Sequence, residues 1–436
     1  MKEVPTPTLI DVAQLRIGMF VHLDGGWMSH PFPLSSFKIG SSAQIATIRS
    51  LGKQRVRWSP DKSDPAAVAS LTHPHAADDA SLHDTVPAEA AVEPIPESPE
   101  AAERRQRRDA LAAQRESLRV CEQQFAEATS ACKRASDAVV TRPAEAREQT
   151  EALAQAFVDK MIGQQEMCIR LLTEAAGDKA SLHAVNVAVI SLLMGKTFGL
   201  SAAEMLDVGV GSMLHDIGKI ELPERVRHRE EHFTPAENQF YQEHVAHGVA
   251  LAKKMGLSAG ATLVIAQHHE HADGSGFPLK LNSDRMTIGS RIVSLVNRYD
   301  NMCNPHLPSR ALTPHEALSL LFAQGKNRYD TAILGGFIKM MGVYPPGSVV
   351  QLTDDRYAMV VSVNSARPLK PRVMVHEPKV PRDEALLLNL ENEPRLGIRR
   401  SLKPQQLPTE SLDYLSPRTR VAYFFEPDVV PLEEAA

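Results

Sequence analysis

Cysteine is scarce in this chain of 436 residues, and its four copies are scattered. Cys121, Cys132, Cys168 and Cys303 include no C-x-x-C pair, which excludes a zinc knuckle and gives no sign of a disulfide framework. Scattered free thiols are typical of a protein kept in a reducing compartment. We therefore expect a cytoplasmic location.

Long apolar runs and a strong charge of one sign are also missing. The start, MKEVPTPTLI, has no basic stretch followed by an apolar one, so we expect no secretory signal. No apolar run reaches the roughly 18 residues of a membrane helix, so we expect no membrane insertion. The net charge of -5 argues against a partner that is a nucleic acid polymer.

The N-terminal part divides into three segments by composition. Residues 8–60 predict a small α/β module of strands around one short helix. Residues 61–100 are rich in Ala, Pro, Asp and Glu, and cannot bury enough apolar surface to offset the entropy lost on ordering. We expect them to form a disordered linker, followed by one helix at 101–140.

The rest of the chain shows two periodicities. Residues 143–342 follow helical spacing, with Thr234 and Glu237 as a predicted capping box and Gly256 as a predicted helix end. Residues 343–430 change to a period of two, which is typical of a small β-rich domain. The fold class is therefore mainly α, a helical bundle flanked by a small α/β module and a small β-rich domain.

The helix at 101–140 carries a thin heptad seam. Leu111, Leu118, Phe125 and Cys132 are seven residues apart. One interpretation is a helix that lies against its own chain. The other is a coiled coil that forms a homodimer or transmits a signal to a partner protein. Small residues at the core positions of the heptads would make such a coiled coil weak.

Histidine is concentrated in the helical block, where nine of the seventeen lie between His183 and His271. A single buried histidine is more often a hydrogen-bonded core residue than a ligand. Six polar groups on successive helices of one bundle instead match the way bundles build metal sites. These six candidates are His183, His215, Asp216, His244, His268 and His269.

The residue types indicate two divalent ions. Imidazole binds iron, manganese or zinc, and a carboxylate can bridge two ions. A pair about 3.5–4 Å apart activates water and stabilises both oxygens of a phosphoryl transfer. On a regular helix the side chains of His268 and His269 would point about 100° apart. They would then bind two different ions, or a local distortion of the helix would bring them together. Lys219 could neutralise a phosphate, or it could be a helix C-terminal charge beside Gly218.

A flexible loop follows the paired histidines. Asp273, Gly274, Ser275 and Gly276 let backbone N–H groups approach a phosphate or a base edge. Most loops of this composition are only turns.

These motifs resemble the HD-GYP domain, the helical class of the HD phosphohydrolase superfamily associated with cyclic di-GMP hydrolysis. The matching stretches are His183 at a helix start, LHDIGKIELP, HVAHG, HHEHADGSGFP and SRIVSLVNRYD, in the family's order across residues 183–342. The stretch IDVAQLRIGMFVHLDGGWMSHPF is similar to an uncharacterised domain that often precedes HD-GYP domains. The resemblance implies a metal-dependent phosphodiesterase that opens cyclic di-GMP to pGpG, GMP or both.

The resemblance also implies residue roles. The six candidates would bind metal, with Asp216 as the bridging and catalytic carboxylate and Lys219 as a catalytic cation facing the phosphate. Gly276, Phe277 and Pro278 stand at the name-giving Gly-Tyr-Pro triplet. The expected substrate contacts are Lys219, Asp273, Gly274, Gly276, Phe277 and Arg310.

Three positions depart from the family pattern. Asn297 stands where the last metal ligand is an aspartate, and Asp300, one turn later, is a candidate substitute. The segment CNPHLPSRAL replaces a basic substrate-binding motif, which leaves His306 or Arg310 to serve. Lys179 replaces a glutamate that supports a third metal in some members.

We therefore expect at most two ions, iron or manganese, and one ion if Asn297 cannot bind. The alternatives are a signalling protein that binds cyclic di-GMP without turnover, and a phosphohydrolase of another nucleotide.

Overall fold

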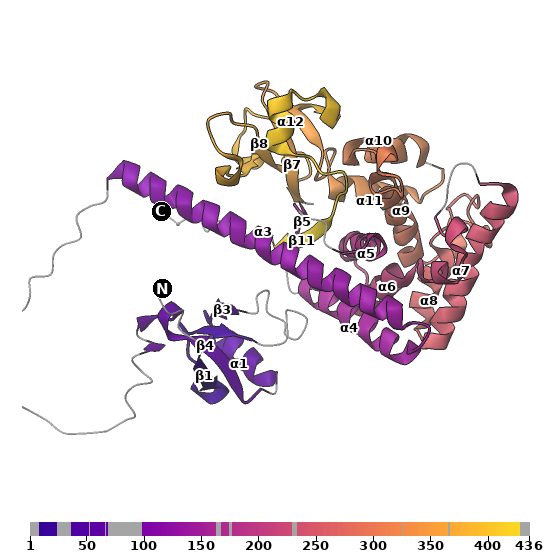
Figure 1. Cartoon of the computed structure of the whole chain (residues 1–436), viewed down its shortest axis with the longest axis horizontal. Helices are drawn as coiled ribbons and strands as arrows, with labels where there is room; N and C mark the ends of the chain where they lie inside the picture. The colour runs from indigo at the N-terminus through magenta and orange to yellow at the C-terminus, as the bar shows by residue number, and fades with distance from the viewer. Residues whose placement is uncertain are drawn as a thin grey trace, which may run out of the picture. The chain divides into compact units, whose positions relative to one another are not determined.

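The structure is a computed structural model that describes residues 8–23, 36–51, 53–65, 67–68, 98–162, 167–173, 177–228, 233–325, 327–364 and 367–427 (Figure 1). The chain divides into two compact units, residues 1–107 and 108–436. The predicted linker at 61–100 falls largely outside the described residues.

The first unit contains a four-stranded antiparallel sheet in the order β1-β4-β2-β3. Its core consists of fully buried apolar side chains such as Met19, Val21 and Ile48, with Ala67 packed beside them. The predicted α/β character of this module is confirmed. Its elements are β1 (Thr8–Asp11), β2 (Phe20–His22), β3 (Ser36–Lys38), α1 (Ser42–Ser50) and β4 (Arg55–Ser59).

The second unit is built around α5, which packs against α4, α6, α9 and α11. The predicted capping box of Thr234 and Glu237 is present at the start of α7, and Gly256 ends that helix in the left-handed conformation. The helices are α3 (Pro99–Ala138), α4 (Pro143–Ile162), α5 (Lys179–Thr197), α6 (Ala202–Leu214), α7 (Pro235–Met255), α8 (Ala259–Gln267), α9 (Ile288–Cys303), α10 (Pro314–Gly325), α11 (Thr331–Met341) and α12 (Thr409–Leu415).

Helix α5 is also the one described helix that is long and apolar enough to cross a membrane by length and composition. In the structure, 78% of its apolar 18-residue stretch is buried inside the protein. Polar residues such as Ser181, Asn186 and Ser191 interrupt its apolar sequence and are buried with it. The apolar character of α5 is that of the central helix of the bundle.

A seven-stranded antiparallel sheet completes the second unit. Strand β5 lies between β7 and β11, so it joins the sheet from inside the range 143–342 that the sequence predicts as helical. The ranges 143–342 and 343–430 therefore share one sheet. The strands are β5 (Met167–Leu171), β6 (Val349–Leu352), β7 (Tyr357–Asn364), β8 (Arg372–Val375), β9 (Leu388–Asn389), β10 (Ile398–Leu402) and β11 (Tyr423–Pro427).

The long helix α3 runs past β5 and β11 (Figure 1). The C-terminal half of its heptad seam is buried against the chain itself, with Phe125 and Cys132 inaccessible and the Phe125 ring 6.3 Å from that of Phe424. Nearer the N-terminus of α3, the side chain of Gln114 is hydrogen-bonded to the backbone of Ala385 and Leu387. Of the two interpretations of this helix, these contacts favour the one in which it packs against its own chain. A homodimer formed through it stays a prediction.

Candidate metal centre

The six predicted ligands come together at one place in the helical bundle. Asp216, His244, His268 and His269 form one group whose ligand atoms all lie within 4.8 Å of one another. His183 and His215 form a second group with the same Asp216. Asp216 is therefore the one carboxylate common to both groups.

The ends of two helices explain how adjacent residues can face the same group of ligand atoms. Helix α6 ends at Leu214 and α8 ends at Gln267, so His215 and His268 are the C-cap residues of these helices. Beyond a helix end, successive side chains are no longer rotated by the roughly 100° per residue of an α-helix. His268 and His269 consequently face the same group, which decides between the two alternatives in favour of a local distortion.

Three histidines are oriented by the backbone of their own helical turn. In each, Nδ1 lies at hydrogen-bond distance from the carbonyl oxygen three residues earlier, so Nδ1 carries the proton. The pairs are His215 with Ser212 at 2.7 Å, His268 with Ile265 at 2.7 Å, and His244 with Tyr241. In the neutral form of each ring this leaves Nε2 unprotonated, as a metal ligand must be.

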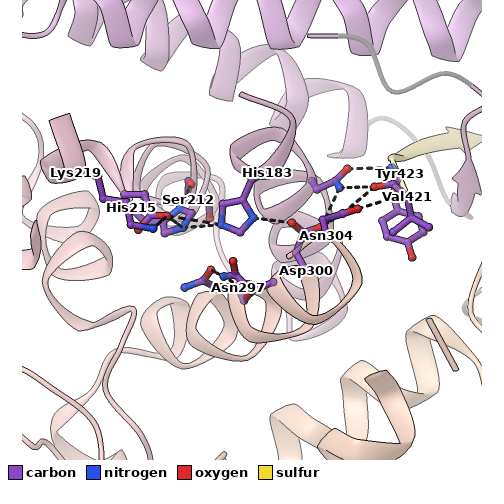
Figure 2. A network of polar contacts seen from close by, with 12 residues as sticks. His183, Ser212, His215, Lys219, Asn297, Asp300, Asn304, Val421 and Tyr423 are labelled. Atoms are coloured by element: carbon purple, nitrogen blue, oxygen red, sulfur yellow. Dashed lines mark hydrogen bonds and ion pairs between the residues drawn. The ribbon is translucent and has the colours of Figure 1, made fainter. Parts of the chain in front are cut away.

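His183 is oriented by a carboxylate instead. Its Nδ1 lies 2.6 Å from Oδ2 of the fully buried Asp300 (Figure 2). Oδ1 of Asp300 accepts hydrogen bonds from the side chains of Asn186 and Asn304, each at 2.9 Å. Both oxygens of Asp300 are thus engaged, so the expectation that it substitutes for a missing ligand is wrong. Asp300 positions His183 in the way that carboxylates commonly orient ligating imidazoles.

The same two asparagines anchor the start of β11. Nδ2 of Asn186 and Nδ2 of Asn304 each donate to the carbonyl of Val421 at 2.9 Å. Their side-chain oxygens accept in return from the backbone N–H groups of Tyr423 and Val421 (Figure 2). A polar network therefore joins the C-terminal strand to His183, and no sequence motif indicated it.

The arrangement of the polar atoms fits bound cations. Nε2 of His183 lies 3.1 Å from Nε2 of His215, and Nε2 of His244 lies 3.4 Å from Nε2 of His268. With no proton between them, such lone pairs repel, whereas an ion about 2 Å from each nitrogen would hold them at this separation. The buried atoms Asp216 Oδ1 and His269 Nε2 also have no hydrogen-bond partner among the described residues.

Asp216 faces both groups, with one oxygen toward each. Its Oδ2 lies 3.5 Å from Nε2 of His215, and its Oδ1 lies 3.6 Å from Nε2 of His244. One oxygen of Asp216 is thus available to each group. The described residues therefore offer a cluster of ligand atoms able to hold divalent metal.

Burial sets the charge states of the cluster. It lowers the pKa of His244 to about 3 and the pKa of His269 well below its usual value, so both rings are neutral at neutral pH. Burial alone would raise the pKa of Asp216, but Lys219 and His215 outweigh it and hold that pKa well below its usual range. Asp216 in turn keeps the pKa of Lys219 above its usual value despite burial.

A glycine allows Lys219 to approach the cluster. A Cβ at Gly218 would lie 1.9 Å from the carbonyl oxygen of His244, so only glycine fits where this short 3-10 helix (Ile217–Glu221) packs on α7. Nζ of Lys219 is 2.6 Å from Oδ2 of Asp216 and 5.4 Å from the centre of the Tyr241 ring. Lys219 is consequently a positive charge held beside the carboxylate that the two groups share.

The DGSGFP loop packs tightly under His269. A Cβ at Gly276 would lie 2.5 Å from the carbonyl oxygen of His269, and the Phe277 ring stacks on His269 with centroids 4.5 Å apart. Asp273 accepts a hydrogen bond from the backbone N–H of Ser275 at 2.9 Å. These contacts support His269, and substrate binding by Asp273, Gly274, Gly276 and Phe277 stays a prediction.

Glu270, which the sequence did not single out, positions the chain after the DGSGFP loop. This fully buried carboxylate accepts hydrogen bonds from the backbone N–H groups of Leu279 and Leu281, at 2.6 and 2.9 Å. It therefore holds the far end of the DGSGFP loop. The only signal was an acidic residue directly after the paired histidines.

The remaining candidates lie around the cluster. Asn297 is buried in α9, and its side-chain oxygen accepts from Nδ2 of Asn301 at 2.6 Å, so its role as a ligand stays a prediction. The His306 ring stacks on that of His228, with centroids 4.1 Å apart. Arg310 is exposed at the end of a short 3-10 helix, Pro308–Arg310.

Comparison with known proteins matches two parts of the chain to described domains. Residues 161–333 match the HD domain family, and residues 8–150 match a domain of unknown function, DUF3391. A cyclic di-GMP phosphodiesterase of Pseudomonas aeruginosa is 26% identical over 384 residues, which cover 84% of each chain. The 3′3′-cGAMP-specific phosphodiesterase 2 of Vibrio cholerae is 31% identical over 129 residues, 29% of this chain and 25% of that protein.

Among solved structures, an HDG"Y"P protein from Bdellovibrio bacteriovorus aligns with a TM-score of 0.41 and 13% identity, covering 76% of this chain and 98% of that one. The matched HD range contains all six clustered ligands. Residues 161–333 therefore match an HD domain, and the match to DUF3391 lies on its N-terminal side.

Proposed function

We propose that this protein is a metal-dependent phosphodiesterase that hydrolyses cyclic di-GMP to pGpG, GMP or both. The observation that supports it most is Asp216, one carboxylate with an oxygen toward each of two histidine groups. This is the donor set that a two-ion phosphodiesterase needs. The similarity to cyclic di-GMP phosphodiesterases supports the choice of substrate.

The two groups would hold one ion each, iron or manganese, with Asn297 as an additional oxygen donor beside His183. Such ions lower the pKa of bound water and stabilise negative charge on phosphoryl oxygens. During hydrolysis a water oxygen bonds to phosphorus, the bond from phosphorus to one ribose oxygen breaks, and that oxygen takes up a proton. Lys219 contributes a permanent positive charge next to the phosphate, because its raised pKa keeps it protonated.

The test is turnover of cyclic di-GMP by the purified full chain loaded with manganese or ferrous iron, with metal per chain counted on the same sample. We expect product and about two metals per chain. Asp216→Ala should lose both metal and turnover, whereas Asp413→Ala, an exposed carboxylate on α12, should lose neither. A wild-type protein that makes no product would contradict the proposal.

Two alternatives have distinct outcomes in that experiment. Cyclic di-GMP affinity without product would indicate a signalling protein that binds the nucleotide. Turnover of 3′3′-cGAMP in preference to cyclic di-GMP would indicate a phosphodiesterase of another nucleotide, which the Vibrio cholerae relative makes worth assaying.

A further inference from the structure

Lys179 and Arg420 are two positive side chains without an anionic partner among the described residues. Nζ of Lys179 is buried and makes no hydrogen bond to any described residue. Arg420, from a segment far along the chain, likewise makes no ion pair or hydrogen bond with the described residues. A buried ammonium without a partner is costly, so its retention calls for a ligand.

Lys179 lies on the same side of α5 as a metal ligand. It is the first residue of that helix, and His183 follows four residues later, which places the two side chains one turn apart on one face. Because long helical side chains lean toward the helix N-terminus, we expect the Lys179 side chain to extend beyond His183 at that end of the cluster.

Arg420 is brought to the same place by β11. It directly precedes Val421, whose carbonyl is held by Asn186 of α5 and by Asn304 at the end of α9. Asn304 and Asn186 also hold Asp300, the partner of His183. The network drawn in Figure 2 therefore fixes the backbone beside Arg420 at the His183 end of the cluster.

The charges of these groups act on one another. Burial lowers the pKa of Lys179 to about 8, and the positive charges of Arg420 and Lys219 add to that effect. Burial also lowers the pKa of His228 to about 4, with His306, Lys219 and Lys179 contributing. Lys179, Arg420 and Lys219 therefore lie near enough to influence one another's charge, and Lys179 and Lys219 also act on His228, whose ring stacks on His306.

We propose that Lys179 and Arg420 form a phosphate-binding pair beside the His183 end of the cluster and hold a phosphate group of the substrate there. The pair deepens the proposed function and rests on it for the identity of the substrate. An ammonium and a guanidinium are the two side chains that bind phosphate oxygens most strongly, one as a point charge and one as a planar fork. Lys219, whose positive charge also acts on Lys179, would attract the same anion.

The test uses the manganese-loaded full chain and inorganic phosphate as the probe, with binding measured by titration calorimetry and metal counted in each sample. We expect Lys179→Gln and Arg420→Gln each to weaken phosphate binding about tenfold with unchanged metal content. Lys179→Arg should keep most of the affinity. Arg418→Gln, which removes an exposed charge two residues from Arg420, should change little.

Thermal unfolding provides a readout that does not depend on activity. Lys179→Gln should raise the unfolding temperature without phosphate, because it removes an unpartnered buried charge, and should reduce the further increase that phosphate causes. Phosphate affinity equal to wild type in both glutamine variants, or a wild type that binds no phosphate, would overturn the pair. If phosphate binding follows the expected pattern but cyclic di-GMP is not hydrolysed, the pair stands and the proposed function fails.

Discussion

At the scale of single residues, Asn297 and Asp300 have different roles although they lie one turn apart on α9. Asp300 has both oxygens occupied by His183, Asn186 and Asn304 and acts as the positioning residue of His183. Asn297 has an amide oxygen that one neighbour, Asn301, already contacts. A neutral amide is a weaker donor to a hard cation than a carboxylate.

Replacement of Asn297 by aspartate should strengthen the His183 group. We expect Asn297→Asp to raise manganese affinity by about tenfold or more and to raise turnover, because a carboxylate adds negative charge beside the ion. Metal titration followed by activity assays checks this. Asn392→Asp, which adds the same charge at an exposed position, serves as the control. Unchanged affinity would show that residue 297 is not a ligand.

Loss of the Asp300 charge should affect one ion more than the other. Asp300→Asn leaves Nδ1 of His183 without its charged acceptor, so we expect about 10–100-fold weaker binding of the ion held by the His183 group. The metal count should fall from about two per chain toward one, since His244, His268 and His269 are untouched. Asp284→Asn is the exposed control. Equal loss of both ions would contradict this division.

At the scale of elements, the contact of α3 and α4 with β11 buries a charge. Lys160 of α4 lies 5.3 Å from the ring centre of Phe424 and 5.0 Å from that of Phe425, and it is hydrogen-bonded to Gln124 of α3. Burial lowers its pKa to about 8. The folded pKa is thus below the unfolded one, so this group destabilises the fold at neutral pH and ceases to do so above the unfolded pKa.

Substitution of Lys160 by methionine should stabilise the fold at pH 7. The pKa change corresponds to about 3 kcal/mol, and the lost contacts with the two rings offset about 1–2 kcal/mol of it. We expect a thermal midpoint higher by a few degrees at pH 7, with the advantage shrinking as the pH rises from 8 toward 10.5. Unfolding scans across this range test it against Lys253→Met, an exposed control. A constant difference at every pH would rule out the charge as its cause.

At the scale of the whole molecule, the seven-stranded sheet ties the C-terminal segment to the helical bundle. Strand β5 pairs with β7 on one side and with β11 on the other. Phe424 and Phe425 of β11 are fully buried, with Phe157 of α4 packed edge-on against both rings. The helices around the metal cluster therefore depend on strands near the end of the chain.

Truncation tests this dependence. A fragment of residues 99–436 should unfold cooperatively and bind metal, because it contains β7 and β11, the two strands that pair with β5. A fragment of residues 99–342 should show no cooperative transition, since β5 would expose unpaired backbone and α4 would lose its aromatic partners. Thermal scans monitored by circular dichroism distinguish the two. A cooperative transition in the shorter fragment would show that the helical range folds without the sheet.

The local features of this protein follow from its sequence, and the long-range ones do not. The capping box of Thr234, the helix end at Gly256 and the strands after residue 343 depend on neighbouring residues, so periodicity and capping chemistry predict them. The clustering of histidines likewise showed in their number and helical setting.

Other features arise only where distant segments meet. Met167–Leu171 is a short apolar run that periodicity cannot distinguish from a helix, and it becomes a strand because β7 and β11 offer hydrogen bonds on both sides. Asp300 contacts His183 across 117 residues, and Asn186 contacts Val421 across 235. Such pairings are set by the packing of the folded chain, which is why the tertiary structure alone assigned the role of Asp300 and the anchoring of β11.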